Sequence, residues 1–210
     1  MKNASITEFV NKLSSKEPTP GGGAAAGVAA GLGVAAIMMA IEFSNTDKLD
    51  EDVQTLLTDT LKQFDESKVK FLDIINRDAD EFMPLSRAYG MPRATDEEKE
   101  ARSQAIQEGL VTASQAPLDL IKGAVEVVEQ TEKVLPHIKK GIVSDVGVGL
   151  QMLRSAMTSS SLNVYINAGS LKDEALVEEY ISGTEKKLAA TTARIDDLFT
   201  KVNKIIRPNS

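Results

Sequence analysis

The stretch from Phe71 to Phe82 places one carboxylate inside an apolar helical stripe. At about 100° per residue, Phe71, Ile75 and Phe82 share a narrow arc of a single helix. Asp78 falls inside that arc, whereas Asp80 points to the opposite side. Burial raises the pKa of a carboxyl that has no cationic partner, which suits a general acid–base near neutral pH. An aspartate that pairs with an arginine or caps a neighbouring helix would fit the same position, so the spacing leaves both roles open.

A second carboxylate, Asp145, follows Ser144 near an expected helix start. If that helix is continuous, the face of Asp145 also carries Gly149, Met152, Ala156 and Asn163. An acid in the first turn also stabilises the helix dipole, and for Asp145 alone this simpler role is favoured.

Three glycines, Gly21 to Gly23, follow Pro20 and lead into an uncharged run of alanine and glycine. Main-chain N–H groups at such a helix start can face an anion, and the missing side chains allow close approach to the backbone. The loop is neither a Walker loop, since no Gly-Lys-Ser/Thr follows, nor a dinucleotide fingerprint after a strand. Taken alone, such a loop is more often a flexible entry to a core helix.

The composition narrows the chemistry to carboxylates. The 210 residues include no cysteine and one histidine, His137, which argues against thiolate chemistry and histidine-rich zinc sites. We therefore expect no metal. The net charge of −7 argues against a nucleic-acid surface. The N-terminus lacks the hydrophobic region of a signal peptide, so the cytoplasm is the expected location.

Helical periodicity runs through the whole chain, and sustained alternation typical of strands is absent. The run 24–41 reaches the length of a membrane span, but its alanine and glycine content and its flanks favour a buried helix without membrane contact.

Ser144 is expected to cap a helix, and Pro117 to kink or break one. No linker divides the chain. The sequence predicts a single all-α domain over 1–210, folded as an up-and-down helical bundle. Further expected helices cover 5–13, 50–84, 95–113, 117–135, 144–168 and 173–206.

The order of several motifs resembles the cyclodeaminase domain of formiminotransferase-cyclodeaminase and the stand-alone methenyltetrahydrofolate cyclohydrolases. The matching stretches are 18–23, 78–82, 95–102 with 106–109, 117–118, 144–145 and 163–167. The resemblance implies a homodimer formed through long helices and a folate groove lined partly by the glycine loop. It places the proposed catalytic aspartate on Asp78. One departure is Lys139, which stands where relatives carry the asparagine of a Gly-Asn pair.

The resemblance implies a formimidoyltetrahydrofolate cyclodeaminase, in which Asp78 moves a proton while N10 attacks the formimino carbon and ammonia leaves. The alternative is a methenyltetrahydrofolate cyclohydrolase, and a third possibility is a non-catalytic helical scaffold. A scaffold predicts that Asp78 is solvated or salt-bridged and that no pocket adjoins the glycines. The implied substrate-binding residues are Pro20, Gly21, Gly22, Gly23, Asp145 and Asn163. No tightly bound cofactor is expected. The resemblance is also compatible with a polyglutamylated folate as substrate and with a separate formiminotransferase as partner.

Overall fold

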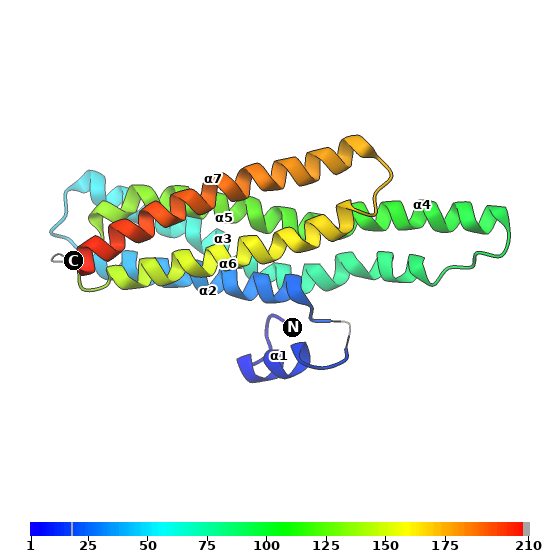
Figure 1. Cartoon of the computed structure of the whole chain (residues 1–210). Helices are drawn as coiled ribbons and strands as arrows, with labels where there is room; N and C mark the ends of the chain where they lie inside the picture. Colours follow the sequence, from blue (N-terminus) through cyan, green and yellow to red (C-terminus); the bar gives the residue numbers. More distant parts are fainter. Residues whose placement is uncertain (18, 208–210) are drawn as a thin grey trace.

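The computed structural model describes residues 1–17 and 19–207, so Pro18 of the glycine-loop motif lies outside the described residues. Within those ranges the chain forms helices and no strand, which confirms the predicted all-α bundle (Figure 1). The elements are α1 (Ile6–Leu13), α2 (Gly22–Ser44), α3 (Glu51–Tyr89), α4 (Asp96–Ala113), α5 (Gln115–Val134), a 3₁₀ turn η1 (Leu135–His137), α6 (Val143–Ala168) and α7 (Glu174–Ile206).

The alanine- and glycine-rich helix α2 lies between α3 and α6 in the core of the bundle. A Cβ at Gly27 would lie 2.9 Å from the Phe71 carbonyl oxygen, and one at Gly33 would lie 2.9 Å from that of Gly149. Glycine at these positions lets both neighbouring helices approach the α2 backbone. By length and composition α2 could also span a membrane, but in the structure it is largely buried among the other helices, as predicted.

Two predicted helix boundaries are wrong. Helix α3 continues through Pro84 to Tyr89, because the last turns pack tightly on α4: a Cβ at Gly109 would lie 2.8 Å from the Leu85 Cα. Tertiary packing therefore offsets the hydrogen bond that proline removes. Helix α6 begins at Val143 with no side-chain cap, so Ser144 lies inside it.

The α4–α5 boundary is the break that Pro117 predicted. Helix α4 ends at Ala113, α5 begins at Gln115, and Pro117 occupies the first turn of α5, where a missing N–H costs little. A capping box starts α4, as expected for a helix beginning at 95: Thr95 and Glu98 exchange hydrogen bonds. The end of α3 and the start of α4 extend past the rest of the bundle as a two-helix arm (Figure 1).

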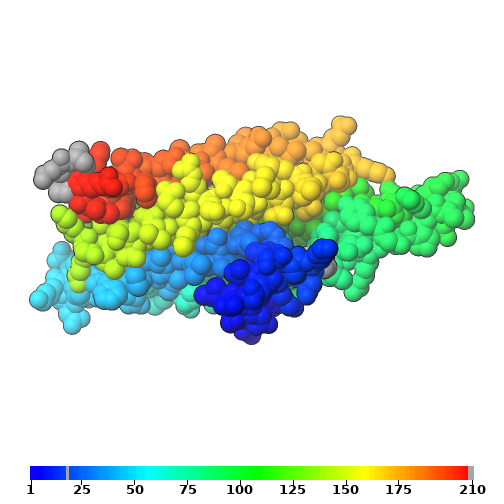
Figure 2. All heavy atoms as spheres, turned by 60° about the horizontal axis from the view of Figure 1, so that its bottom comes forward, coloured from blue at the N-terminus to red at the C-terminus, as the bar shows by residue number. Residues whose placement is uncertain are grey.

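Helix α1 lies on the outside of the bundle (Figure 2) and packs against α2 and α3, where Phe9 clusters with Ala24 and Ile75. Ser5 caps it by accepting a hydrogen bond from the Glu8 N–H at 3.1 Å. Of the apolar side chains of α1, only Phe9 is buried, whereas Ile6 is 81% exposed and Val10 is 53% exposed. The apolar face of α1 is thus only partly covered by its own chain.

Candidate active site

A cavity of about 260 Å³ lies at the end of the bundle where α2 begins. Four segments far apart in the sequence contribute to it: the loop before α2 with the first turn of α2, the second half of α3, the last residue of α4 and the last turns of α6. The lining residues are Thr19, Gly21, Gly22, Gly23, Asp78, Phe82, Ala113, Asn163, Ile166 and Asn167. Five of the seven predicted site residues therefore meet here, together with five that were not predicted.

Asp78 is half-buried and faces the first turn of α2. Its Oδ2 accepts a hydrogen bond from the Ala24 N–H at 3.1 Å. Burial raises the pKa of the Asp78 carboxyl; the Ala24 hydrogen bond opposes this rise, and the negative charge of Glu81 adds to it. Asp78 thus caps a neighbouring helix, one of the two roles left open by its spacing, and lines a cavity as well.

The three glycines of the loop differ in what surrounds them. A Cβ at Gly23 would overlap Asp78 Oδ1 and lie 2.5 Å from its Cγ, so only glycine lets the Asp78 carboxylate reach the α2 N-terminus. A Cβ at Gly22 would meet no atom within 4 Å. Gly22 also lines the cavity, so the space beside its backbone belongs to the cavity and is not filled by a packed neighbour.

Two amide side chains from α6 complete the polar lining. Asn163 and Asn167 are four residues apart and therefore lie on the same face of the helix. No side-chain hydrogen bond of either is found within residues 1–17 and 19–207, so both amides can bind a ligand. Asn167 was not predicted as a site residue, although its i,i+4 spacing from Asn163 could have indicated it.

Phe82 and Ile166 form the apolar part of the rim. Phe82 was predicted to continue the buried stripe of α3, but it is 37% exposed and borders the cavity. Ile166 is 72% exposed. An aromatic ring and an aliphatic side chain at the opening suit a ligand with a flat, partly apolar surface.

Other predicted residues lie outside this cavity. Pro20 is buried just before the glycines, and Thr19 lines the cavity in its place. Asp145 lies eighteen residues before Asn163 on α6, about 27 Å along the helix, and contacts Ser144 Oγ at 3.5 Å. Lys139 is at the opposite end of α2, where its Nζ donates to the Phe43 carbonyl at 2.7 Å.

Two other sequence-based expectations bear on the site. Among the described residues, no three His, Cys, Asp or Glu side chains cluster as metal ligands, and the expectation of no metal stays a prediction. The scaffold alternative predicted no pocket beside the glycines and a solvated or salt-bridged Asp78. The structure instead has a cavity there, and within its described part Asp78 forms no ion pair.

Comparison with known proteins identifies the fold and the family. Residues 5–186 match the family model described as formiminotransferase-cyclodeaminase. The chain is 34% identical over 200 residues to a methenyltetrahydrofolate cyclohydrolase of Methylorubrum extorquens, covering 95% of this chain and 96% of that protein. A formimidoyltransferase-cyclodeaminase of Gallus gallus is 28% identical over 166 residues, but only 31% of that longer protein is covered.

A solved structure shares the fold over nearly the whole length. The formiminotetrahydrofolate cyclodeaminase of Thermotoga maritima superposes with a TM-score of 0.80 at 23% identity, covering 99% of this chain and 98% of that one. With the family match over most of the sequence, these similarities show that the chain belongs to the formiminotransferase-cyclodeaminase family.

Proposed function

We propose that the chain is a folate one-carbon enzyme that hydrolyses the methenyl bridge of 5,10-methenyltetrahydrofolate, with Asp78 as its general acid–base. One observation carries the proposal: Asp78 is the only ionisable side chain among the described residues that line the cavity. Its pKa is raised by burial, which brings a carboxyl closer to the range in which it can both accept and return a proton.

The reaction needs one group that moves a proton twice. Water adds to the bridging carbon of the substrate while the Asp78 carboxylate accepts one of its protons. The protonated Asp78 then donates to N5 as the bond from N5 to the bridging carbon breaks. The hydroxyl on that carbon releases its proton to solvent and becomes the formyl oxygen of 10-formyltetrahydrofolate. Asp78 returns to its starting state, and one proton is released in total.

The remaining lining suits a folate. A cavity of about 260 Å³ is smaller than the roughly 300–1,000 Å³ of sites that enclose a drug-sized ligand, so it holds the reacting ring while the tail extends outward. Gly22 exposes backbone to the ring, and Asn163 and Asn167 provide amide donors and acceptors. Pro20 and Asp145, which lie outside this cavity, stay predictions from the resemblance.

The whole-length similarity to a protein named as a cyclohydrolase favours hydrolysis over the cyclodeaminase reaction expected first. The cyclodeaminase reaction is the second candidate, because several relatives carry that name. In that reaction Asp78 would accept the proton from N10 as N10 attacks the formimino carbon, and would donate it to the departing nitrogen. The same carboxyl serves both reactions.

A direct turnover assay separates the two candidates. Purified protein is given 5,10-methenyltetrahydrofolate or 5-formiminotetrahydrofolate, and the absorbance of the methenyl compound is followed. Loss of absorbance with the first substrate supports hydrolysis, and a gain with the second supports cyclodeamination. If neither rate exceeds the rate without protein, the proposed function is wrong.

We also infer that two copies associate through one apolar face, called here the α2–α6 face. Its large exposed side chains recur at helical spacing on the two helices, and they are Leu32, Met39, Phe43, Val148, Leu162 and Ile166. Figure 2 shows α2 and α6 side by side on this side of the molecule, with α1 in front of α2. Extended apolar surface of this kind is typical of an interface, and a two-fold pair would cover it with the same face of a second copy.

We further propose a cytoplasmic location, which was expected from the N-terminal sequence. From the resemblance we propose a polyglutamylated substrate, a separate formiminotransferase that would supply a formimino substrate, and a place in one-carbon metabolism or histidine catabolism.

A further inference from the structure

Two carboxylates on successive turns of α3 each bind the first turn of a different helix. Asp78 Oδ2 accepts from the Ala24 N–H of α2 at 3.1 Å, and Glu81 Oε2 accepts from the Ala116 N–H of α5 at 2.8 Å. Neither α2 nor α5 has a side-chain hydrogen bond from a cap residue of its own. Helix α3 therefore supplies both missing caps from side chains three residues apart, which lie on the same side of the helix.

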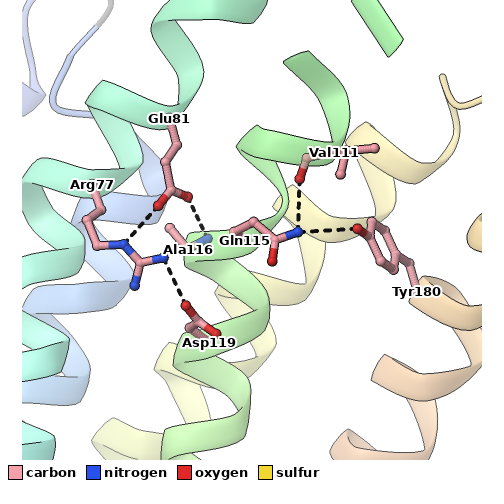
Figure 3. A network of polar contacts seen from close by, with 7 residues as sticks. All are labelled: Arg77, Glu81, Val111, Gln115, Ala116, Asp119 and Tyr180. Atoms are coloured by element: carbon pink, nitrogen blue, oxygen red, sulfur yellow. Dashed lines mark hydrogen bonds and ion pairs between the residues drawn. The ribbon is translucent and has the colours of Figure 1, made fainter. Parts of the chain in front are cut away.

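Glu81 is held on both of its oxygens. Its Oε1 accepts from Arg77 Nε at 2.8 Å, and a second guanidinium nitrogen of Arg77 donates to Asp119 Oδ2 at 2.8 Å (Figure 3). The Glu81 side chain is only 19% exposed. Asp78 accepts a single hydrogen bond, and its Oδ1 has no donor among the described residues. Glu81 is thus the fixed carboxylate of the pair, and Asp78 is the one available to a ligand.

The first turn of α5, to which Glu81 is hydrogen-bonded through Ala116, lies close to the cavity wall. Gln115, next to Ala116, donates to the Val111 carbonyl and to the Tyr180 hydroxyl, so the start of α5 is bound to α4 and α7 as well (Figure 3). Ala113, two residues before Gln115, lines the cavity. The Glu81 contact therefore sets the distance between α3, which carries Asp78, and the α4–α5 junction on the facing wall.

Helix α3 needs such support at this point. Pro84, three residues after Glu81, lacks the N–H that would bond to the Asp80 carbonyl. The intrahelical hydrogen bonding is therefore weakened in the turn that follows Asp78. A carboxylate anchored to a neighbouring helix compensates for this weakness.

We propose that Glu81 is a positioning residue for Asp78: it fixes the turn of α3 that carries the Asp78 carboxyl against the first turn of α5, and it places a second negative charge one turn away. This inference rests on the proposed role of Asp78 as the acid–base group. Glu81 itself does not line the cavity and touches no reacting atom.

Few other charged groups near the cavity can change the effect of the Glu81 charge on the pKa of Asp78. Of the other elements at the cavity, the loop before α2, the first turn of α2, the end of α4 and α6 contribute no ionisable group to its lining. On α3 itself, the nearby cation is Arg77, which is bound to Glu81 and Asp119. After burial, the Glu81 charge is the remaining cause that raises the pKa of Asp78. Removing that charge therefore lowers this pKa.

The experiment compares Glu81→Gln with Asp119→Asn, each of which removes one carboxylate partner of Arg77. Glutamine keeps an oxygen that can accept from Ala116, so the fold is retained, but it removes the negative charge and the ion pair with Arg77 that fixes the other oxygen. The protein is labelled with ¹³C at aspartate carboxyls, and the Asp78 signal, assigned with Asp78→Asn, is titrated by NMR. We expect its midpoint to move to lower pH in Glu81→Gln and to stay in place in Asp119→Asn. An unchanged midpoint in Glu81→Gln, or an equal shift in both variants, overturns the proposal.

Turnover of the folate is measured on the same variants. We expect kcat of Glu81→Gln to fall several-fold with KM unchanged, and the acidic limb of its pH profile to move to lower pH. A changed KM with an unchanged kcat and pH profile overturns the positioning role. If the wild-type protein turns over neither folate while the NMR shift is observed, the proposed function fails but the effect of Glu81 on Asp78 stands.

Discussion

The Asp78 carboxylate accepts a hydrogen bond from the Ala24 N–H, so one side chain caps the core helix α2 and lines the cavity at the same time. Gly23 makes this contact possible, because any side chain there would overlap the carboxylate. The glycine loop and the aspartate, more than fifty residues apart in the sequence, thus form one structural unit. The consequences can be tested separately for stability, binding and rate.

Replacing Asp78 by asparagine should stabilise the folded protein at neutral pH. The pKa of Asp78 is raised in the folded state, so its contribution to stability is present below the unfolded pKa of about 3.9 and is lost as the pH rises through the folded pKa. Asparagine avoids the cost of burying a charge, and its amide oxygen can still accept from Ala24. Thermal unfolding across the acid-to-neutral range should show a higher Tm for Asp78→Asn at neutral pH and a smaller difference in acid.

The exposed Asp80 provides the control for this stability test. Asp80→Asn, on the same helix, should show no such pH-dependent difference. If Asp78→Asn instead melts below wild type at neutral pH, the ionised cap of α2 outweighs the cost of burying the charge, and Asp78 is chiefly structural.

Substitutions at Gly22 and Gly23 should affect different kinetic constants. A Cβ at Gly22 enters open space in the cavity lining, so Gly22→Val should raise KM by about tenfold or more, roughly 1.4 kcal/mol of binding, with little change in Tm. A Cβ at Gly23 would displace the Asp78 carboxylate, so Gly23→Ala should mainly lower kcat. Steady-state kinetics with thermal melts distinguish the two. A lower Tm with unchanged KM for Gly22→Val would mean that the loop is only structural.

Association through the α2–α6 face should depend on its exposed apolar residues. Light scattering of the wild type is expected to return the mass of a dimer at micromolar concentration. Phe43→Glu and Leu162→Glu place a charge in that face and should return a monomer. Val69→Glu is a matched control, because Val69 is similarly apolar and 47% exposed but lies on α3, outside the face. A wild-type monomer, or a dimer that survives both glutamates, contradicts the inference.

The fold and part of the site could be predicted from the sequence because they depend on local periodicity. The helical phase alone separated Asp78 from Asp80, and the composition of α2 indicated a helix approached closely on several sides. Features that depend on tertiary contacts could not be predicted in this way. Phe82 shares the phase of the core stripe, but at its level the core gives way to a cavity. Ile6 and Val10 fit an amphipathic helix that their own chain does not cover.

Helix ends also depend on tertiary contacts that the local sequence does not reveal. Ser144 is a good cap by residue type, yet α6 starts one residue earlier, at the fully buried Val143. The caps of α2 and α5 come from Asp78 and Glu81 on α3, which no pattern near either helix start could reveal.

The most direct test of the account is the turnover of Asp78→Asn beside Asp80→Asn on 5,10-methenyltetrahydrofolate and 5-formiminotetrahydrofolate. Asparagine keeps the size and the Ala24 hydrogen bond of Asp78 but cannot exchange a proton at neutral pH. Loss of a general acid–base costs about 10²–10⁴ in rate, or roughly 3–5 kcal/mol of barrier. We predict a loss of this size for Asp78→Asn with folate binding retained, and a rate close to wild type for Asp80→Asn. Near wild-type turnover by Asp78→Asn would contradict the central claim.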